Sequence, residues 1–241
     1  VAYQVEGAVN QLASNFTTSI TPQIVKSYAK GDKKRFFQLI YEAGRYSYFL
    51  MFIVAFPIIL EADYILKLWL VKVPVYTVLF TRFVLAIALY RIIVRSTING
   101  VHATGDVKTL NLTSGVYVAC TFLPLIYILF KCGLPVWSCF IIYAFNGVVC
   151  NIFEARALYK REKFDILRYI TYVYLHPIAV SMIAAILPFV IVFTMEESFL
   201  RLVLTLLVSS LCTLICVYTF GINKDARKIV NTFILNKIRK K

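Results

Sequence analysis

The sequence predicts an all-α membrane protein, a bundle of about seven helices that cross a bilayer. Hydrophobic residues make up 60% of the 241 residues and charged residues only 16%, a balance outside the range of ordinary soluble domains. Apolar stretches of about 20 residues, long enough to cross roughly 30 Å of hydrocarbon, recur along the chain. Most Lys and Arg residues lie in the short breaks between these stretches. Together these observations predict a polytopic transmembrane helical bundle.

Seven expected spans follow one another with short connections. They cover residues 1–28, 41–60, 75–98, 110–130, 134–158, 170–193 and 199–220. The first is the least hydrophobic. Gly133 and Pro135 predict a tight turn between the fourth and the fifth. Residues 1–220 are therefore expected to form one transmembrane unit.

A basic tail, residues 221–241, follows the last span. It alternates apolar and cationic side chains at helical spacing; the apolar ones are Val230, Phe233, Ile234 and Ile238. This pattern is typical of an amphipathic helix lying on an anionic leaflet. A solvated basic end explains the same residues, and the sequence leaves both interpretations open.

Positive charge separates the two sides of the predicted bundle. Alternate loops and the tail contain 20 of the 26 Lys and Arg residues. Cytoplasmic loops carry such an excess, so we expect a cytoplasmic C-terminus and Val1 at the outer face. This start also predicts at least one further helix before Val1. The net charge of +14 then belongs beside a membrane, and nucleic acid is not an expected partner.

No pattern in the sequence predicts catalysis. The two histidines accompany no metalloprotease, hydrolase or nucleotide-binding motif, and the six cysteines form no CxxC pair. Five of these cysteines lie in apolar stretches, where they resemble small buried hydrophobes. We therefore expect no metal, no cofactor and no enzymatic activity.

A polar stripe marks the first expected span. Gln4, Gln11, Asn15 and Thr18 recur at steps of seven, four and three residues, which places them on one helical face. Such a face could line a cavity for a hydrophilic cargo, or it could hydrogen-bond neighbouring helices. Pro22 lies near the end of this span and is a candidate for a gating bend; a fixed kink is the alternative.

Arginines inside expected spans are the second group of candidates. Arg91 and Arg95 lie one turn apart, whereas Arg82 falls on the other side of the same helix. Arg45 lies in the second span with Glu42 three residues before it, which allows a local ion pair. Cavity-facing guanidinium groups would suit a diphosphate. The alternative for Arg91 and Arg95 is snorkelling to the cytoplasmic interface.

Three segments resemble polysaccharide flippases, which belong to the superfamily that also contains multidrug and toxin exporters. Tyr3–Asp32 is similar to that family's polar helix, Pro-x-Ile step and Tyr-Ala-x-Gly-Asp loop. Pro57–Phe83 resembles its outer loop with Leu-Trp-Leu, and Ala103–Lys108 its cytoplasmic Ala-x-Gly turn. The segments occur in the family's order, and the resemblance extends over essentially the whole chain.

The resemblance implies the C-terminal portion of a two-lobed O-antigen or capsule flippase, from the second helix of that lobe to an extra terminal helix pair. Such proteins move undecaprenyl-diphosphate-linked oligosaccharide outward across the bacterial inner membrane for lipopolysaccharide assembly, by alternating access. The implied partners are this lipid-linked oligosaccharide, membrane lipids, a Na⁺ or H⁺ gradient, and the polysaccharide polymerase and chain-length machinery.

Two alternatives remain open. A multidrug exporter of the same superfamily would favour acidic cavity residues for cationic cargo. A membrane-embedded acyltransferase or glycan polymerase would need an acid, base or nucleophile, for which His102 and Asp106 are the nearest candidates.

Overall fold

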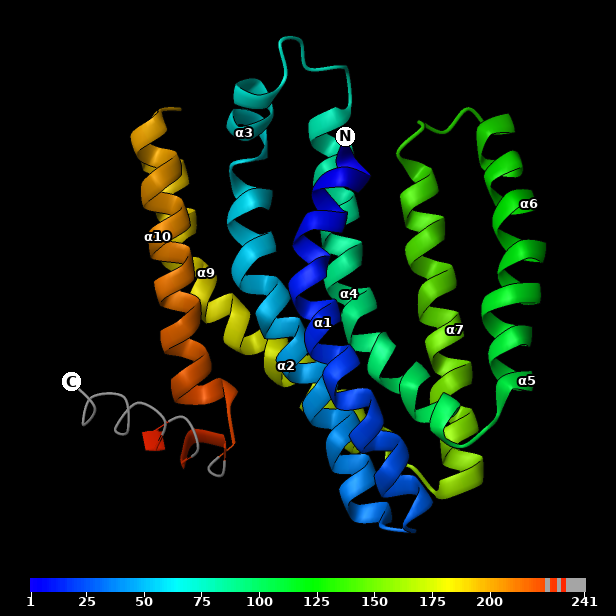
Figure 1. The fold of residues 1–241 in the computed structure, drawn as a ribbon. Coiled ribbons are helices and arrows are strands. Elements are labelled where there is room, and N and C mark those ends of the chain that lie inside the picture. The colour runs from blue at the N-terminus through cyan, green and yellow to red at the C-terminus, as the bar shows by residue number, and fades with distance from the viewer. Residues whose placement is uncertain (224–225, 229–230, 233–241) are drawn as a thin grey trace.

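The computed structural model describes residues 1–223, 226–228 and 231–232, with the backbone alone at 113 and 114. Within these residues the regular secondary structure is helical and no strand occurs. This confirms the predicted all-α bundle (Figure 1). The expected amphipathic segment of the tail falls largely outside the described residues.

The helices alternate in direction along the bundle. The first four are α1 (Ala2–Ala29), α2 (Lys33–Leu60), α3 (Ala62–Trp69) and α4 (Thr77–Ala103). A continuous helix then combines α5 (Val107–Leu110), η1 (Asn111–Tyr117) and α6 (Val118–Lys131), and α7 (Ser138–Glu162) follows. Another combines α8 (Ile166–Tyr169), η2 (Ile170–Leu175) and α9 (His176–Thr194), before α10 (Phe199–Cys216) with η3 (Val217–Gly221). Val1 lies at the upper end of the bundle in Figure 1, and α10 ends at the lower end.

Six helical segments within the described residues are long and apolar enough to cross a membrane. They are Lys33–Leu60, Thr77–Ala103, Val107–Lys131, Ser138–Glu162, Ile166–Thr194 and Phe199–Gly221. The first expected span, residues 1–28, forms the 28-residue helix α1 but is not among them. Its Gln, Asn, Ser and Thr side chains lower its mean hydropathy. The helix α1 therefore has the length of a spanning helix but not the apolar composition.

Several helices extend beyond the apolar windows into charged ends. The helix α2 begins at Lys33 because the Asp32 carboxylate accepts a hydrogen bond from the Arg35 amide at 3.0 Å, an N-terminal cap. Lys and Arg, which begin α2, are good helix formers. The short helix α3 lies where only a loop was expected.

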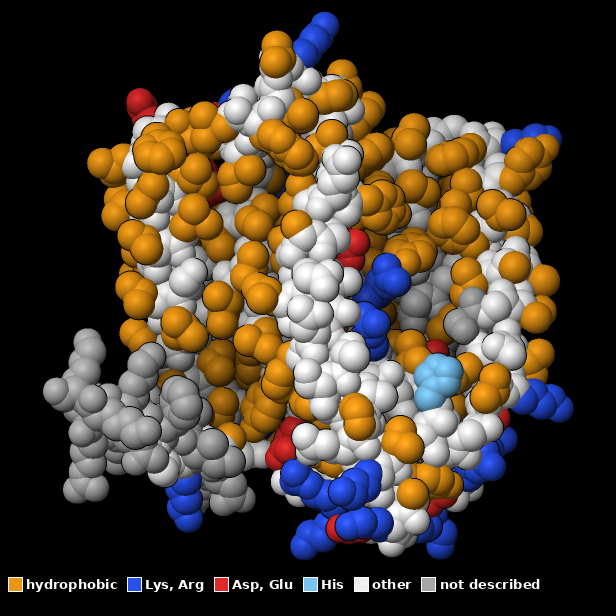
Figure 2. Space-filling model, in the orientation of Figure 1, with side chains coloured by type: hydrophobic (Ala, Val, Ile, Leu, Met, Phe, Trp, Pro, Cys, Tyr) orange, Lys and Arg blue, Asp and Glu red, His pale blue; other side chains and the backbone are white. Residues whose placement is uncertain are grey.

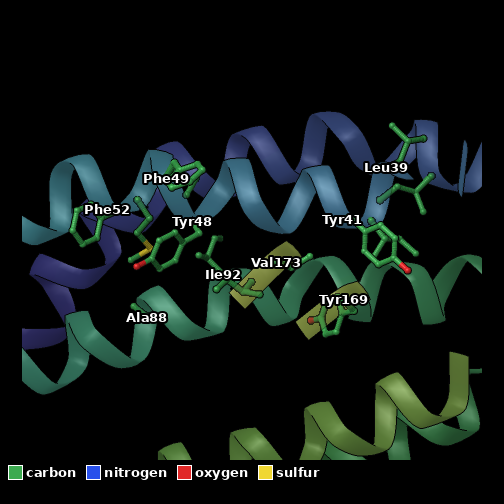
Figure 3. Packing of buried hydrophobic residues seen from close by; sticks show 14 of the residues in the cluster. Leu39, Tyr41, Tyr48, Phe49, Phe52, Ala88, Ile92, Tyr169 and Val173 are labelled. Atoms are coloured by element: carbon green, nitrogen blue, oxygen red, sulfur yellow. The ribbon is translucent and has the colours of Figure 1, made fainter. Parts of the chain in front are cut away.

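The helix α2 forms the centre of the core and packs against α1, α4, α9 and α10. Figure 3 shows its Leu39, Tyr48, Phe49 and Phe52 beside residues of α4 and η2. A β-carbon added at Gly44 would lie 2.7 Å from the hydroxyl oxygen of Ser96. Glycine therefore allows α2 and α4 to approach closely, as small residues do in membrane bundles.

Helices at the two edges have fewer neighbours. The helices α9 and α10 pack on each other and on α2, and α6 packs mainly on α7. Figure 1 shows α6 and α7 diverging from α1 and α4 toward the upper end. The space beside this hairpin contains the candidate site.

Candidate functional site between α1, α4 and α7

A hollow of about 600 Å³ lies among α1, α4, α7 and the start of α6. This volume is within the roughly 300–1,000 Å³ that is usual for small-molecule sites. Its charged and titratable lining comprises Glu6, Tyr90, Arg91, Arg95, His102, Tyr143, Cys150 and Glu154. In Figure 2 blue Lys or Arg side chains are visible in a recess at mid-height, bordered by orange apolar surface. The recess is therefore polar although apolar helices surround it.

Two arginines one turn apart give the hollow its positive charge. The Arg91 guanidinium lies 5.6 Å from the centre of the Tyr143 ring, a cation–π arrangement. Arg95 donates from Nη1 to the Ser14 hydroxyl of α1 at 3.0 Å. Neither arginine forms an ion pair with a carboxylate in the described part of the chain. Both guanidinium groups thus keep donors for an anion.

The lower part of the hollow contains an unusual acid. Glu154 of α7 is 1% exposed, and its Oε2 has no hydrogen-bond partner among the described residues. It also lacks a cationic partner there. An unpaired carboxylate is expensive inside a membrane and usually has a function. The four-residue spacing of Asn146, Cys150 and Glu154 was the available sequence signal for this face.

The predicted polar stripe of α1 lies next to the hollow and does not line it. Gln4, Gln11, Asn15 and Thr18 are exposed, on the face opposite the buried residues of α1. Gln11 Nε2 donates to Asn15 Oδ1 at 3.1 Å. A neighbouring row on α1, with Glu6, Asn10 and Ser14, provides the wall of the hollow and the Arg95 contact. Figure 2 shows α1 as a white, largely non-hydrophobic band down the molecule.

The other predicted arginines lie elsewhere. Arg82 donates from Nε to the Ile59 carbonyl at 3.1 Å and from Nη2 to Asp63 at 2.7 Å. Arg45 is buried at 2% exposure; its Nε donates to the Gly221 carbonyl at 2.7 Å, and its Nη2 donates to the same oxygen. No Arg45–Glu42 ion pair forms among the described residues. Arg82 therefore links α4 to the end of α2 and the start of α3, and Arg45 links α2 to the end of η3.

Three further sequence candidates, Pro22, His102 and Asp106, have either a local structural role or no visible role. The helix α1 continues through Pro22. His102 faces the hollow, but Asp106 caps α5, where its two carboxylate oxygens accept from the Thr109 amide at 3.2 Å and hydroxyl at 2.7 Å. These hydrogen bonds hold the pKa of Asp106 below its usual value. Nothing in this geometry joins His102 and Asp106 into an acid–base pair.

Comparison with known proteins returns no relative. No protein-family model matches the chain, and no curated protein or solved structure gives a significant match. The described residues also contain no group of three or more His, Cys, Asp or Glu side chains that could hold a metal ion. The architecture itself is clear: an all-α bundle with six described helical segments long and apolar enough to span a membrane.

Proposed function

We propose that this protein moves a hydrophilic, anionic cargo across a membrane and does not transform it chemically. The cargo class is an undecaprenyl-diphosphate-linked oligosaccharide for surface-polysaccharide assembly. The observation that carries the proposal is the pair Arg91 and Arg95, which lies in a hollow beside spanning helices without a carboxylate partner in the described chain. Charged groups at such positions mark substrate pathways in membrane proteins.

The chemistry of the hollow suits a diphosphate attached to a glycan. Guanidinium groups offer forked donors that match phosphate oxygens, and they stay charged at any physiological pH. The amides of Asn10, Asn99 and Asn146 line the same space and can hydrogen-bond sugar hydroxyl groups. The apolar outer surface would leave the isoprenoid tail in lipid.

The exposed stripe of α1 supports transport by alternating access. Amide side chains on a membrane helix face protein or water in preference to lipid. A second lobe facing Gln4, Gln11, Asn15 and Thr18 would close a polar passage between two walls, which is the usual arrangement of repeats in transporters.

The proposed orientation in the membrane and the proposed energy source for transport are both argued from the positions of charged residues. The basic end of the bundle is proposed to be cytoplasmic, in a bacterial inner membrane, with the C-terminus on that side. Glu154 is the proposed acceptor for a coupling H⁺ or Na⁺, because it is the buried acid of the hollow without a described cationic partner. The polymerase and chain-length machinery are proposed as later partners for the exported cargo.

A multidrug exporter is the second candidate, favoured by one observation. Glu6 and Glu154 line the same hollow as the arginines, and carboxylates would attract cationic drugs. An acyltransferase or polymerase has weaker support, because Asp106 is engaged in capping α5.

Complementation of a strain that lacks its polysaccharide flippase tests the proposal. The full-length protein would be compared with Arg91→Gln, Arg95→Gln and the double variant at equal membrane abundance. A charge-assisted hydrogen bond is worth about 1.5–3 kcal/mol, so each replacement should slow export about tenfold or more. Lys131→Gln, a cation at the opposite end of α6 whose ammonium lies over Tyr127, is the matched control and should retain export.

Three outcomes separate the candidates. Full surface glycan in the double variant would reject the arginine site. Resistance to cationic drugs that Glu154→Gln abolishes, and that the arginine variants leave unchanged, would favour the multidrug exporter. Loss of activity in His102→Ala with normal export in every arginine variant would favour an enzyme.

A further inference from the structure

A second pocket lies at the lower, basic end of the bundle, far along the helices from the hollow. Its volume is about 230 Å³, below the roughly 300–1,000 Å³ that encloses a drug-sized ligand. It therefore suits part of a molecule, such as a headgroup. Lys34, Lys163 and Arg168 provide its cations.

The pocket lies at the level where several spans begin or end. Lys34 is in the first turn of the Lys33–Leu60 segment, and Lys163 directly follows the Ser138–Glu162 segment. Arg168 is in the first turn of Ile166–Thr194, and Asn223 follows Phe199–Gly221 by two residues. The ends of spanning helices lie at the boundary between hydrocarbon and headgroups, so this pocket would open among lipid headgroups.

Its cations are free to bind an anion. Lys34, Lys163 and Arg168 are exposed, and none of them forms an ion pair with a carboxylate in the described part of the chain. The Arg168 guanidinium lies 5.9 Å from the centre of the Tyr41 ring, against the pocket floor. Lys163 adopts φ 58° as it ends α7, a left-handed conformation that directs the chain sharply into α8.

The two acids of the pocket already have partners. Glu42 accepts hydrogen bonds from the amides of Gln38 at 2.8 Å and Asn223 at 3.4 Å. Asp165 accepts from the Arg168 backbone amide at 3.0 Å, as the cap of α8. Three cations thus face two carboxylates engaged with neutral donors, which leaves the pocket net positive.

Phe37, Tyr41 and Tyr172 complete the lining with aromatic surface. Aromatic side chains with a polar tip are favoured at membrane interfaces, where one end meets hydrocarbon and the other water. A cationic rim over an aromatic floor matches a phosphate joined to glycerol and acyl chains. Basic pockets between spanning helices bind lipid headgroups in this way.

We propose that this pocket binds the phosphate of an anionic phospholipid from the leaflet at the basic end of the bundle. The proposal does not depend on the transported cargo, since the pocket and the hollow share no lining residue. The bound lipid would join α2, the connection between α7 and α8, and the end of α10.

The test measures lipid retention by the purified full chain in mixed micelles, by native mass spectrometry. Phosphatidylglycerol and phosphatidylcholine are the two probes. Each Lys or Arg near a membrane surface contributes about 1 kcal/mol to binding of anionic lipid, which is about fivefold in affinity. We expect Lys163→Gln and Arg168→Gln each to weaken phosphatidylglycerol binding about fivefold and to leave phosphatidylcholine unchanged.

Lys72→Gln and Lys131→Gln remove the same charge at the upper end of the bundle and serve as controls. Equal loss of phosphatidylglycerol in these controls would reduce the effect to net charge and overturn the site. Unchanged binding in the Lys163→Gln, Arg168→Gln double variant would overturn it as well. Displacement of the lipid by millimolar inorganic phosphate would assign the pocket to free phosphate, against our proposal. Thermal unfolding of each variant establishes that binding is measured on folded protein.

Discussion

The ion pair between Glu61 and Arg201 allows a quantitative prediction for the attachment of the terminal helix pair. The Glu61 side chain has no exposed surface and that of Arg201 is 8% exposed. Glu61 accepts from Arg201 Nε at 3.0 Å and Nη2 at 2.8 Å, and from the Thr205 hydroxyl at 3.0 Å. Arg201 Nη1 also donates to the Met195 carbonyl at 3.1 Å. The pair therefore joins the junction of α2 and α3 to α10 with its polar atoms satisfied.

Replacing one member of the ion pair with alanine leaves the charge of the other member buried and unpaired. Loss of one member of a buried pair costs about 3–5 kcal/mol. The pair lies near the upper ends of its helices, where water can approach an unpaired charge. We therefore expect Glu61→Ala to lower the free energy of unfolding by about 3 kcal/mol, the low end of that range. The double variant Glu61→Ala, Arg201→Ala should cost less than the sum of the two single variants, because no unpaired charge remains.

Unfolding in mixed micelles titrated with a denaturing detergent would measure these free energies. Lys67→Ala is the matched control, since Lys67 and Glu197 form an exposed pair at 2.6 Å at the same end of the bundle. Exposed pairs are weakened by solvent and salt, so this control should lose much less stability. A Glu61→Ala cost no larger than that of Lys67→Ala, or simple additivity in the double variant, would refute the reasoning.

Two further predictions concern the helix crossing and the hollow. Gly44→Val should destabilise the bundle by about 1–3 kcal/mol through overpacking, because the added carbon would meet Ser96 and Val173 at 2.7 Å; Gly7→Val, with open space around it, is the control in the same unfolding assay. Under the proposed transport function, Glu154→Gln should uncouple export from the ion gradient while leaving the bundle as stable as the wild type, because it removes the proposed ion acceptor. Gradient-driven uptake of labelled lipid-linked oligosaccharide into inverted vesicles measures this, and unchanged dependence on the gradient would contradict it.

The sequence was sufficient to predict the spanning helices, but it predicted their ends less well. Apolar windows identify spanning segments because the hydrocarbon thickness fixes their length. They stop at the first charges, whereas the capped helix α2 begins among them at Lys33. The eight-residue α3 was missed because its apolar residues resemble part of an outer loop, although two of them, Ala62 and Leu66, are buried.

The candidate site was harder to predict, because a pattern on one helix does not reveal what packs beside it. Arg45 and Arg91 both appear as cations in apolar windows. The acceptor of Arg45 lies 176 residues later, at the end of η3, and no local sequence pattern predicts this contact. The stripe of α1 was correctly placed on one face, but that face points away from the bundle.

The arginines in the spanning helices differ in the acceptors that the described chain offers them. Arg201 has Glu61, Arg82 has Asp63, and Arg45 has the Gly221 carbonyl at a helix end, where the helix dipole favours positive charge. Arg91 and Arg95 have only an aromatic ring and a neutral hydroxyl in the described chain. The fold supplies strong acceptors for three buried or half-buried arginines, and it leaves two neighbouring ones beside the hollow without such acceptors in the described chain. This difference supports the proposed anionic cargo.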